Sequence, residues 1–204
     1  MRKIVAIGGG EIVTPDEISE TRKIDKEIIK LSGKRYPKLL FIPTASRDSV
    51  VYCKNVLANF GTELGCDVEF LRLYSEKAPE VIENKILSTD IIYVGGGNTY
   101  AMMKRWRALG VDKLLAKAAA KGTIMSGLSA GSICWFRHGA SSSRKQINPE
   151  APMIRVSGLG WVNAVMCPHY HIEKDRRPYL KELMKKTTGV AFGVDDCCAI
   201  EIID

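Results

Sequence analysis

The stretch "GTIMSGLSAGSICWF", residues 122–136, places a serine in the frame G-L-S-A-G. The apolar run before the serine is typical of a buried strand, and the run after it favours a helix. Small residues on both sides permit a tight turn that exposes the hydroxyl group. The stretch therefore predicts a strand, a sharp turn and a helix, with Ser129 either a nucleophile or only a small residue that the turn requires.

The same alternation of strand and helix precedes this stretch. Short β-branched runs alternate with longer amphipathic runs, which is typical of a parallel sheet covered by helices on both faces. The sequence therefore predicts an α/β fold, a three-layer sandwich with a mostly parallel sheet. We expect strands at 3–7, 39–44, 68–74 and 91–97, and helices at about 16–32, 49–63, 79–87, 98–109 and 111–121.

The second half of the chain is less regular. Residues 139–160 are rich in Ser, Pro and Gly, which predicts a long surface loop. A strand that ends near His169, a helix at about 174–187 and two final strands, "GVAFGVD" and "CAIEII", follow. We find no repeat and no linker, so we expect one domain over residues 1–204.

Composition indicates a soluble protein. Apolar residues make up 46% and charged residues 26%, and no apolar run approaches the roughly 18 residues of a membrane span. Glu11 follows the first apolar run too early for a signal peptide, and the six cysteines form no C-x-x-C pair, so we expect a cytoplasmic protein with reduced thiols. The net charge of +7 is scattered along helices, which disfavours nucleic acid as a partner. We expect a monomer or a homodimer.

In sheets of this kind, ligands bind beyond the carboxyl ends of the strands. A nucleophilic Ser129 requires a base there, and the chain has three histidines. We expect His138 near the end of the helix that follows the serine, roughly 13 Å along its axis and out of reach. His169 follows an apolar strand, which predicts a place on the same sheet edge as Ser129. His171 is expected in a supporting or surface role, since an H-x-H metal pair lacks a third ligand here.

A carboxylate is needed to orient the base, and Asp195 and Asp196 close a predicted strand. Adjacent strand residues point in opposite directions, so one of them can orient His169 while the other faces solvent or caps the turn. Glu173 and Asp175 start a helix, where a capping role is expected.

Acyl transfer also requires N–H donors for an oxyanion. One candidate is the amide of Ala130, directly after the serine at a helix N-terminus. The run "VGGGNT" can supply a second, because glycines let the backbone approach a ligand and Asn98 can cap the next helix. A nucleotide phosphate loop is the alternative for 8–10 and 95–97, but neither run matches G-x-G-x-x-G with its downstream acid, or the P-loop.

Four linked motifs, "VGGGNTY", "SGLSAGS", "CPHYH" and "GVDD", together resemble peptidase E, the α-aspartyl dipeptidases, and more distantly the cyanophycinases. The resemblance implies a flavodoxin-like sheet related to class I glutamine amidotransferases, with serine in place of their cysteine. It also implies that Ser129 is the nucleophile, His169 the base, and Gly97 and Ala130 the oxyanion donors. No metal or organic cofactor is implied.

The implied activity is hydrolysis of dipeptides that start with aspartate, through an acyl-enzyme. Asn98 and Arg176 would bind this small peptide substrate, since a guanidinium group suits a carboxylate. The family acid is a glutamate after Gly-Leu-Pro, whereas this chain places Asp196 there. The alternatives are a β-aspartyl peptide hydrolase similar to cyanophycinases, and a non-catalytic ligand-binding protein on the same fold.

Overall fold

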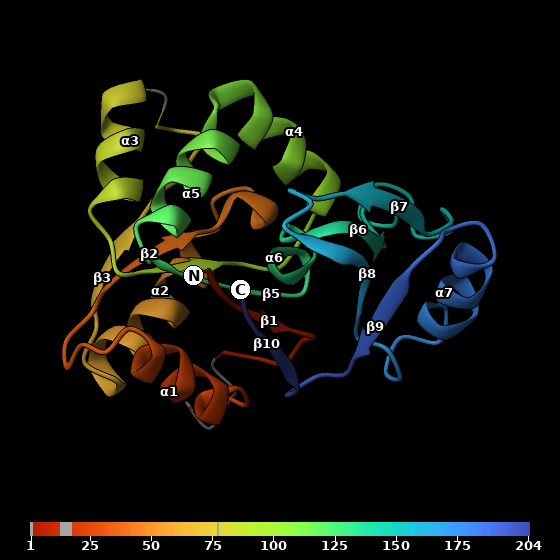
Figure 1. The fold of residues 1–204 in the computed structure, drawn as a ribbon, viewed down its shortest axis with the longest axis horizontal. Helices are drawn as coiled ribbons and strands as arrows, with labels where there is room; N and C mark the ends of the chain where they lie inside the picture. Colours follow the sequence, from red (N-terminus) through yellow and green to blue (C-terminus); the bar gives the residue numbers. More distant parts are fainter. Residues whose placement is uncertain (1, 13–17, 77) are drawn as a thin grey trace.

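The structure, a computed structural model, describes residues 2–12, 18–76 and 78–204. Two sheets form its framework (Figure 1). In the main sheet, of order β10-β1-β5-β4-β2-β3, five strands run parallel and β10 pairs antiparallel with β1. The carboxyl ends of β1, β5 and β4 therefore lie side by side. The six strands are β1 (Lys3–Ile7), β2 (Lys38–Ile42), β3 (Asp67–Phe70), β4 (Ile91–Val94), β5 (Ile124–Leu128) and β10 (Ala199–Ile203).

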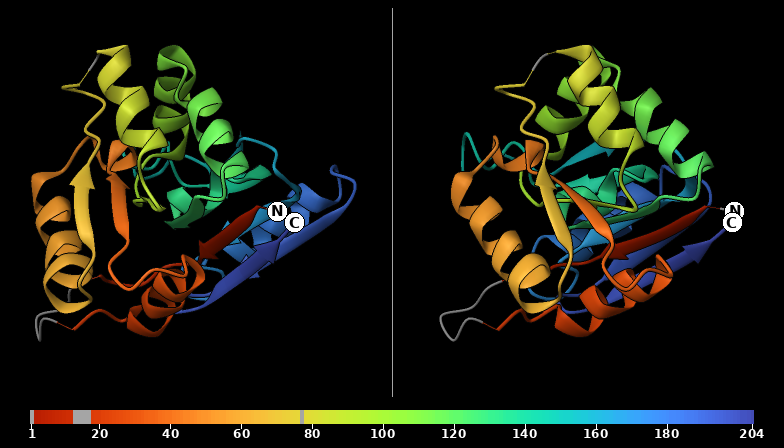
Figure 2. Two further views of the ribbon diagram at one scale, coloured as in Figure 1. Left: turned by 60° about the vertical axis from the view of Figure 1, so that its left-hand side comes forward. Right: turned by 90° about the vertical axis from the view of Figure 1, so that its left-hand side faces the viewer.

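Helices cover both faces of the main sheet (Figure 2). Leu39 and Phe41 of β2 belong to the core under α1 and α2, whereas their neighbours Leu40 and Ile42 belong to the core under α3, α4 and α5. Burial on both faces explains why these strands read as continuous apolar runs, and it confirms the predicted α/β fold. The helices are α1 (Arg22–Leu31), α2 (Val50–Val56) with its π-helical continuation η2 (Leu57–Glu63), α3 (Pro79–Leu87), α4 (Thr99–Leu109) and α5 (Val111–Ala120); a 3₁₀ turn, η1 (Thr44–Ser46), precedes α2.

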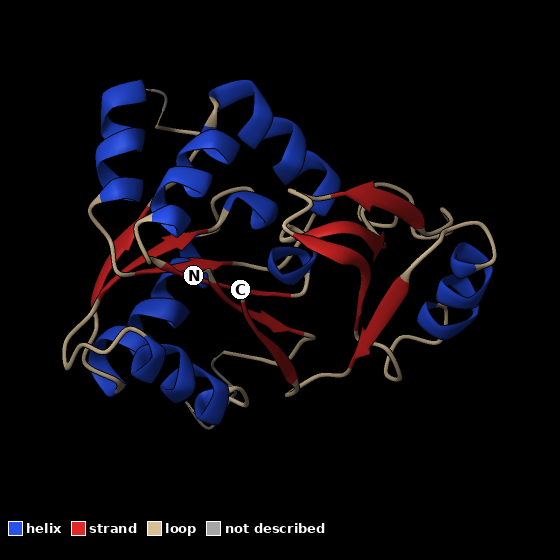
Figure 3. Ribbon diagram, in the orientation of Figure 1, coloured by secondary structure: helices blue, strands red, loops and turns tan. Residues whose placement is uncertain are grey.

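A second sheet, of order β7-β6-β8-β9, lies beside the main sheet and packs against α7 (Figure 3). The strand that leads to His169, β8, pairs with β6 and β9 of this second sheet. The prediction that His169 and Ser129 lie on the same edge of one sheet is therefore wrong. The elements are β6 (Phe136–Ser141), β7 (Ile154–Ser157), β8 (Val162–Pro168), α7 (Arg176–Met184) and β9 (Val190–Val194).

The region after Ser129 also differs from the prediction. The helix that follows, α6 (Ala130–Ile133), has only four residues, and His138 lies in β6 rather than at a helix end. Gly139 lets β6 pass closely over α6, since a Cβ there would lie 2.4 Å from a methyl group of Ile133. The prediction of a loop over 139–160 is wrong near both ends, because residues 139–141 belong to β6 and residues 154–157 form β7.

Smaller boundary differences occur earlier in the chain. The predicted helix at 16–32 begins at Arg22, and its residues 16 and 17 lie outside the described part. The predicted strand at 68–74 ends at Phe70. The single domain over residues 1–204 stays a prediction.

A fully buried carboxylate ties α1 to its neighbours. Asp25 accepts hydrogen bonds from Ser19 (3.0 Å), Thr21 (3.1 Å) and the Asn59 amide (2.8 Å). Burial outweighs these bonds and raises the pKa of Asp25 to about 6. Between about pH 4 and pH 6 the folded protein therefore holds a proton that the unfolded chain has lost, so stability falls as pH rises through this range.

We expect the Asp25→Asn variant to lose this part of the pH dependence. As pH rises from 4 to 7, the free energy of unfolding of the variant should increase by about 2 kcal/mol relative to that of the wild type, as measured by urea unfolding at several pH values. Asp67→Asn, at an exposed position of β3, is the control and should follow the wild type. Parallel curves for Asp25→Asn and the wild type would contradict the prediction.

Candidate active site

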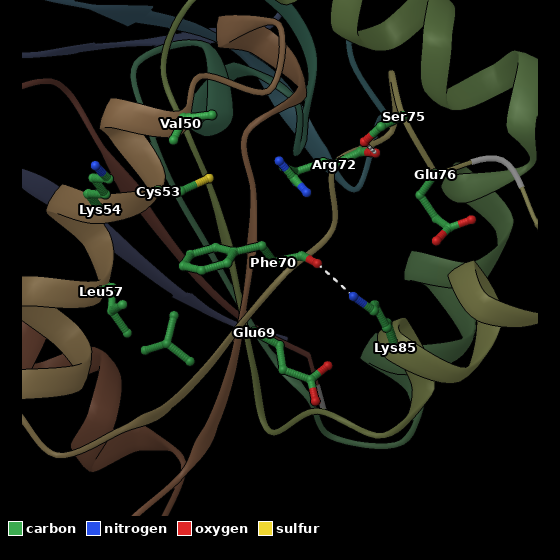
Figure 4. A pocket seen from close by; sticks show the side chains of 11 residues that line it. Val50, Cys53, Lys54, Leu57, Glu69, Phe70, Arg72, Ser75, Glu76 and Lys85 are labelled. Atoms are coloured by element: carbon green, nitrogen blue, oxygen red, sulfur yellow. Dashed lines mark hydrogen bonds between the residues drawn. The ribbon is translucent and has the colours of Figure 1, made fainter.

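One cavity lies along the outer edge of β3, between α2 and α3 (Figure 4). It has a volume of about 610 Å³, and its lining includes Phe70, Arg72 and Lys85. The Lys85 ammonium group donates to the Phe70 carbonyl (2.9 Å) and so covers a free acceptor of this edge strand. No histidine is among the described residues that line this cavity, so it lacks a nucleophile–base pair of the kind predicted from the sequence.

A cleft of about 390 Å³ at the carboxyl ends of β1, β4 and β5 contains the predicted serine. Its described lining has three carboxylates and no lysine or arginine. The side chain of Glu20 is fixed across the cleft wall, because its Oε2 accepts from the Glu11 amide (2.8 Å). The lining includes Gly10, Glu11, Ile12, Glu20, Tyr52, Gly96, Leu128, Ser129, His169 and Asp196.

Ser129 occupies a strained turn between β5 and α6. Its φ of 54° and ψ of −108° are unusual for a residue with a side chain, and its amide donates to the Ile7 carbonyl (3.0 Å). The flanking glycines are required for space: a Cβ on Gly127 would lie 2.4 Å from the Gly131 carbonyl, and one on Gly131 would lie 2.1 Å from the Val94 carbonyl. The turn thus has the geometry of a nucleophile elbow.

Ser129, His169 and Asp196 form one hydrogen-bonded line. The Ser129 Oγ lies 2.8 Å from His169 Nε2, and His169 Nδ1 lies 2.6 Å from Asp196 Oδ1. An ionised carboxylate only accepts, so Nδ1 carries the proton and Nε2 is free to accept the serine proton. The side chains of His169 and Asp196 are 19% and 22% exposed, so the cleft remains accessible to a ligand.

Asp195 points away from this line and pairs with His171. Its Oδ2 lies 2.6 Å from His171 Nδ1, and its Oδ1 accepts from the His171 amide (2.7 Å). The hydrogen bond from the His171 side chain lowers the pKa of Asp195 below its usual range. The pair closes the turn after β8, where His169 has a φ of 52°.

Gly9 has a role that the sequence analysis missed. A Cβ at this position would lie 2.0 Å from Asp196 Oδ1 and 2.4 Å from His169 Nδ1, so only a bare backbone fits beside the pair. A run of glycines after a strand was the available signal for a close approach, but it does not identify the partner.

Neither of the two predicted oxyanion donors, Gly97 and Ala130, is among the described residues that line the cleft, but their backbone amides are unpaired. Within the described residues, the amides of Gly97 and Ala130 have no acceptor, whereas the amides of Gly95, Gly96 and Asn98 donate to Ile42, Tyr52 and Ala45. Gly97 has a φ of 134°, and a Cβ there would lie 2.3 Å from the Ala45 carbonyl.

Asn98 and Arg176 do not line the cleft, contrary to the expected substrate contacts. Asn98 caps α4 by accepting from the Ala101 amide (2.9 Å), and its amide nitrogen donates to the Ser143 carbonyl (3.0 Å). The Arg176 side chain is only 3% exposed, and all three guanidinium nitrogens bind protein groups. Its partners are the Glu173 carboxylate (2.7 Å), the Ala140 carbonyl (2.8 Å) and the Ser142 hydroxyl (3.2 Å).

The described ranges contain neither a cluster of metal ligands nor a helix that could span a membrane. There, no group of three or more His, Cys, Asp or Glu residues is placed to hold a metal ion. Within residues 2–12, 18–76 and 78–204, no helix has the length and apolar character of a membrane span.

Comparisons with known proteins identify a peptidase family. The model of a family described as Peptidase family S51 matches residues 4–204. The uncharacterized peptidase YgaJ of Bacillus subtilis (strain 168) is 34% identical over 206 residues, which cover 100% of this chain and 84% of the relative. A solved peptidase structure from an acI-B1 Actinobacterium has a TM-score of 0.76 at 18% identity, over 99% of this chain and 83% of that one. The solved structure of a candidate peptidase E from Listeria monocytogenes EGD-e has a TM-score of 0.71 at 21% identity. This match covers 99% of this chain and 94% of that one.

Alanine at Gly9 should break the hydrogen-bonded line, because its Cβ overlaps Asp196 and the His169 ring. Labelling of Ser129 by a fluorophosphonate is followed by the intact mass of the protein. We expect the rate of this labelling to fall by about 100-fold or more. In the control Gly160→Ala, φ is 76° and the space is open, so stability falls by about 1 kcal/mol while labelling keeps its rate. Equal labelling of Gly9→Ala and wild type would show that this backbone does not constrain the pair.

Proposed function

The chain belongs to peptidase family S51 and is a serine-type peptidase, and from this premise we propose that it is an exopeptidase that cleaves short peptides through an acyl-enzyme at Ser129. The observation that carries the proposal is the line from Ser129 through His169 to Asp196. Nucleophile, base and orienting acid within hydrogen-bond distance are the arrangement that acyl transfer requires.

The proposed reaction has two halves. The Ser129 Oγ attacks the peptide carbonyl carbon while its proton passes to His169 Nε2, and the Gly97 and Ala130 amides bind the resulting oxyanion. The protonated His169 then gives this proton to the leaving amine as the peptide bond breaks. A water molecule then gives a proton to His169 and attacks the acyl-enzyme. His169 returns this proton to the Ser129 Oγ as the ester bond breaks and the acid is released. Asp196 keeps the proton on Nδ1 and stabilises the imidazolium form.

The substrate class that the resemblance implies is dipeptides with N-terminal aspartate. A cleft of about 390 Å³ is of a size for a small ligand. Two of its carboxylates, Glu11 and Glu20, suit the α-ammonium group at the N-terminus of a short peptide. They do not favour an aspartate side chain, so the aspartate preference has to be measured against neutral and basic first residues.

We expect the wild type to hydrolyse at least one of α-Asp-Ala, β-Asp-Ala, Ala-Ala and Lys-Ala, and Ser129→Ala to lose at least about 1,000-fold in kcat. Release of alanine, measured by amino-acid analysis, reports the rate. The fastest substrate decides between the α-aspartyl, β-aspartyl and broader specificities. Undiminished hydrolysis by Ser129→Ala would exclude this nucleophile, and binding of the peptides without any hydrolysis would favour a non-catalytic protein.

The two aspartates should differ sharply. Asp196→Asn lets an amide replace the carboxylate, which permits the wrong histidine tautomer, so kcat should fall by about 1,000- to 10,000-fold. Asp195→Asn keeps an oxygen that can accept from the His171 amide and should change kcat little. The comparison uses the dipeptide cleaved fastest by wild type. The reverse order of effects would assign the acid to Asp195.

A further inference from the structure

Tyr52 reaches from α2 to the glycine turn that follows β4. Its ring packs edge-on against Phe41, with centroids 5.0 Å apart, and also against Gly95, where a Cβ would lie 2.9 Å from Tyr52 Cε1. The Tyr52 hydroxyl oxygen accepts a hydrogen bond from the Gly96 amide (3.2 Å). The side chain thus holds the turn by both packing and hydrogen bonding.

This contact determines which amide of the turn stays free. The Gly96 amide is occupied by Tyr52, and on the other side the Asn98 amide donates to the Ala45 carbonyl (2.8 Å). The Gly97 amide lies between these two anchors and has no acceptor among the described residues. Gly96 itself is beside the nucleophile, because a Cβ there would lie 3.5 Å from Ser129 Cβ.

The hydroxyl group is suited to act as an acceptor. Burial, with a smaller contribution from the charge of Glu11, raises the pKa of Tyr52 to about 12, so the group stays neutral. Within the described part of the chain, the hydroxyl proton has no acceptor, and the contact to the turn is made by an oxygen lone pair that accepts from the Gly96 amide. Without the hydroxyl, the Gly96 amide would be unpaired and the turn could rotate to satisfy it.

We propose that Tyr52 is a positioning residue of the reaction: by engaging the Gly96 amide, it fixes the Gly97 amide as the oxyanion donor. The proposal rests on the proposed function, since it concerns the oxyanion of that reaction. It adds a residue from α2, outside the four sequence motifs, to the machinery around Ser129.

The test compares Tyr52→Phe with Tyr93→Phe. Tyr93 belongs to the same aromatic group, with its ring 6.1 Å from that of Phe41, and its buried hydroxyl has no hydrogen-bond partner in the described structure. We expect Tyr52→Phe to lower kcat by about 10- to 100-fold with little change in KM, because the affected donor acts in the transition state. A peptide aldehyde, which forms a tetrahedral adduct with the serine, should lose affinity in parallel. Tyr93→Phe should match the wild type in both measurements.

Thermal unfolding of each variant separates positioning from general damage. A fall in kcat at an unchanged Tm supports the proposal. The proposal would be overturned by an unchanged kcat or by a rise in KM alone. It would also be overturned by a reduced Tm together with a kcat that recovers at a lower assay temperature. Fluorophosphonate labelling of wild-type Ser129 is measured beside these assays. A wild type that is neither labelled nor active in hydrolysis would contradict the proposed function itself. An active wild type with an equally active Tyr52→Phe would contradict only this inference.

Discussion

The arrangement at the serine depends on one close approach, that of the Gly9 backbone to His169 and Asp196. Ser129 comes from β5 of the main sheet, whereas the histidine and the aspartate follow β8 and β9 of the second sheet. Gly9 follows β1, the neighbour of β5, and forms an isolated bridge with Asp196. Because any Cβ at Gly9 would overlap both partners, the two sheets reach hydrogen-bonding distance only across a bare backbone. A bare backbone at Gly9 is therefore a condition for the close approach of the two sheets at this point.

Backbone strain is concentrated at the same place. Ser129 and His169 both have positive φ, a conformation that costs on the order of 1–3 kcal/mol for a residue with a side chain. Hydrogen bonds offset part of this cost, from the Ser129 amide to Ile7 and from the Tyr170 amide to Val194. In both cases the turn directs a side chain out of the end of a strand, and in the proposed reaction a proton moves between these two residues.

Local patterns carried most of what could be predicted from the sequence. Buried parallel strands leave continuous apolar runs, and a tight turn requires glycines at fixed spacing, so the main sheet and the turn at Ser129 could be predicted. The three residues expected to act together do lie together. Sheet membership of β8 depends on pairing with distant strands, which no local pattern records. The place of Arg176 depends on tertiary partners that bury its guanidinium group, and the role of Gly9 on contacts about 160 and 190 residues away along the chain.

Arg176 and Asn98, the residues predicted to bind substrate, take part in a second connection between the two sheets. Arg176 binds the Ala140 carbonyl and the Ser142 hydroxyl, at the end of β6. The next residue, Ser143, accepts from the Asn98 side chain and from the Tyr100 amide, at the start of α4. This chain of contacts leads from α7 to the residue after Gly97. The nucleophile and the free amide of Gly97 belong to the main sheet and its connections, and the base belongs to the second sheet, so their relative position depends on both attachments. Polar side chains that do not line the cleft can therefore be required for catalysis without touching a substrate.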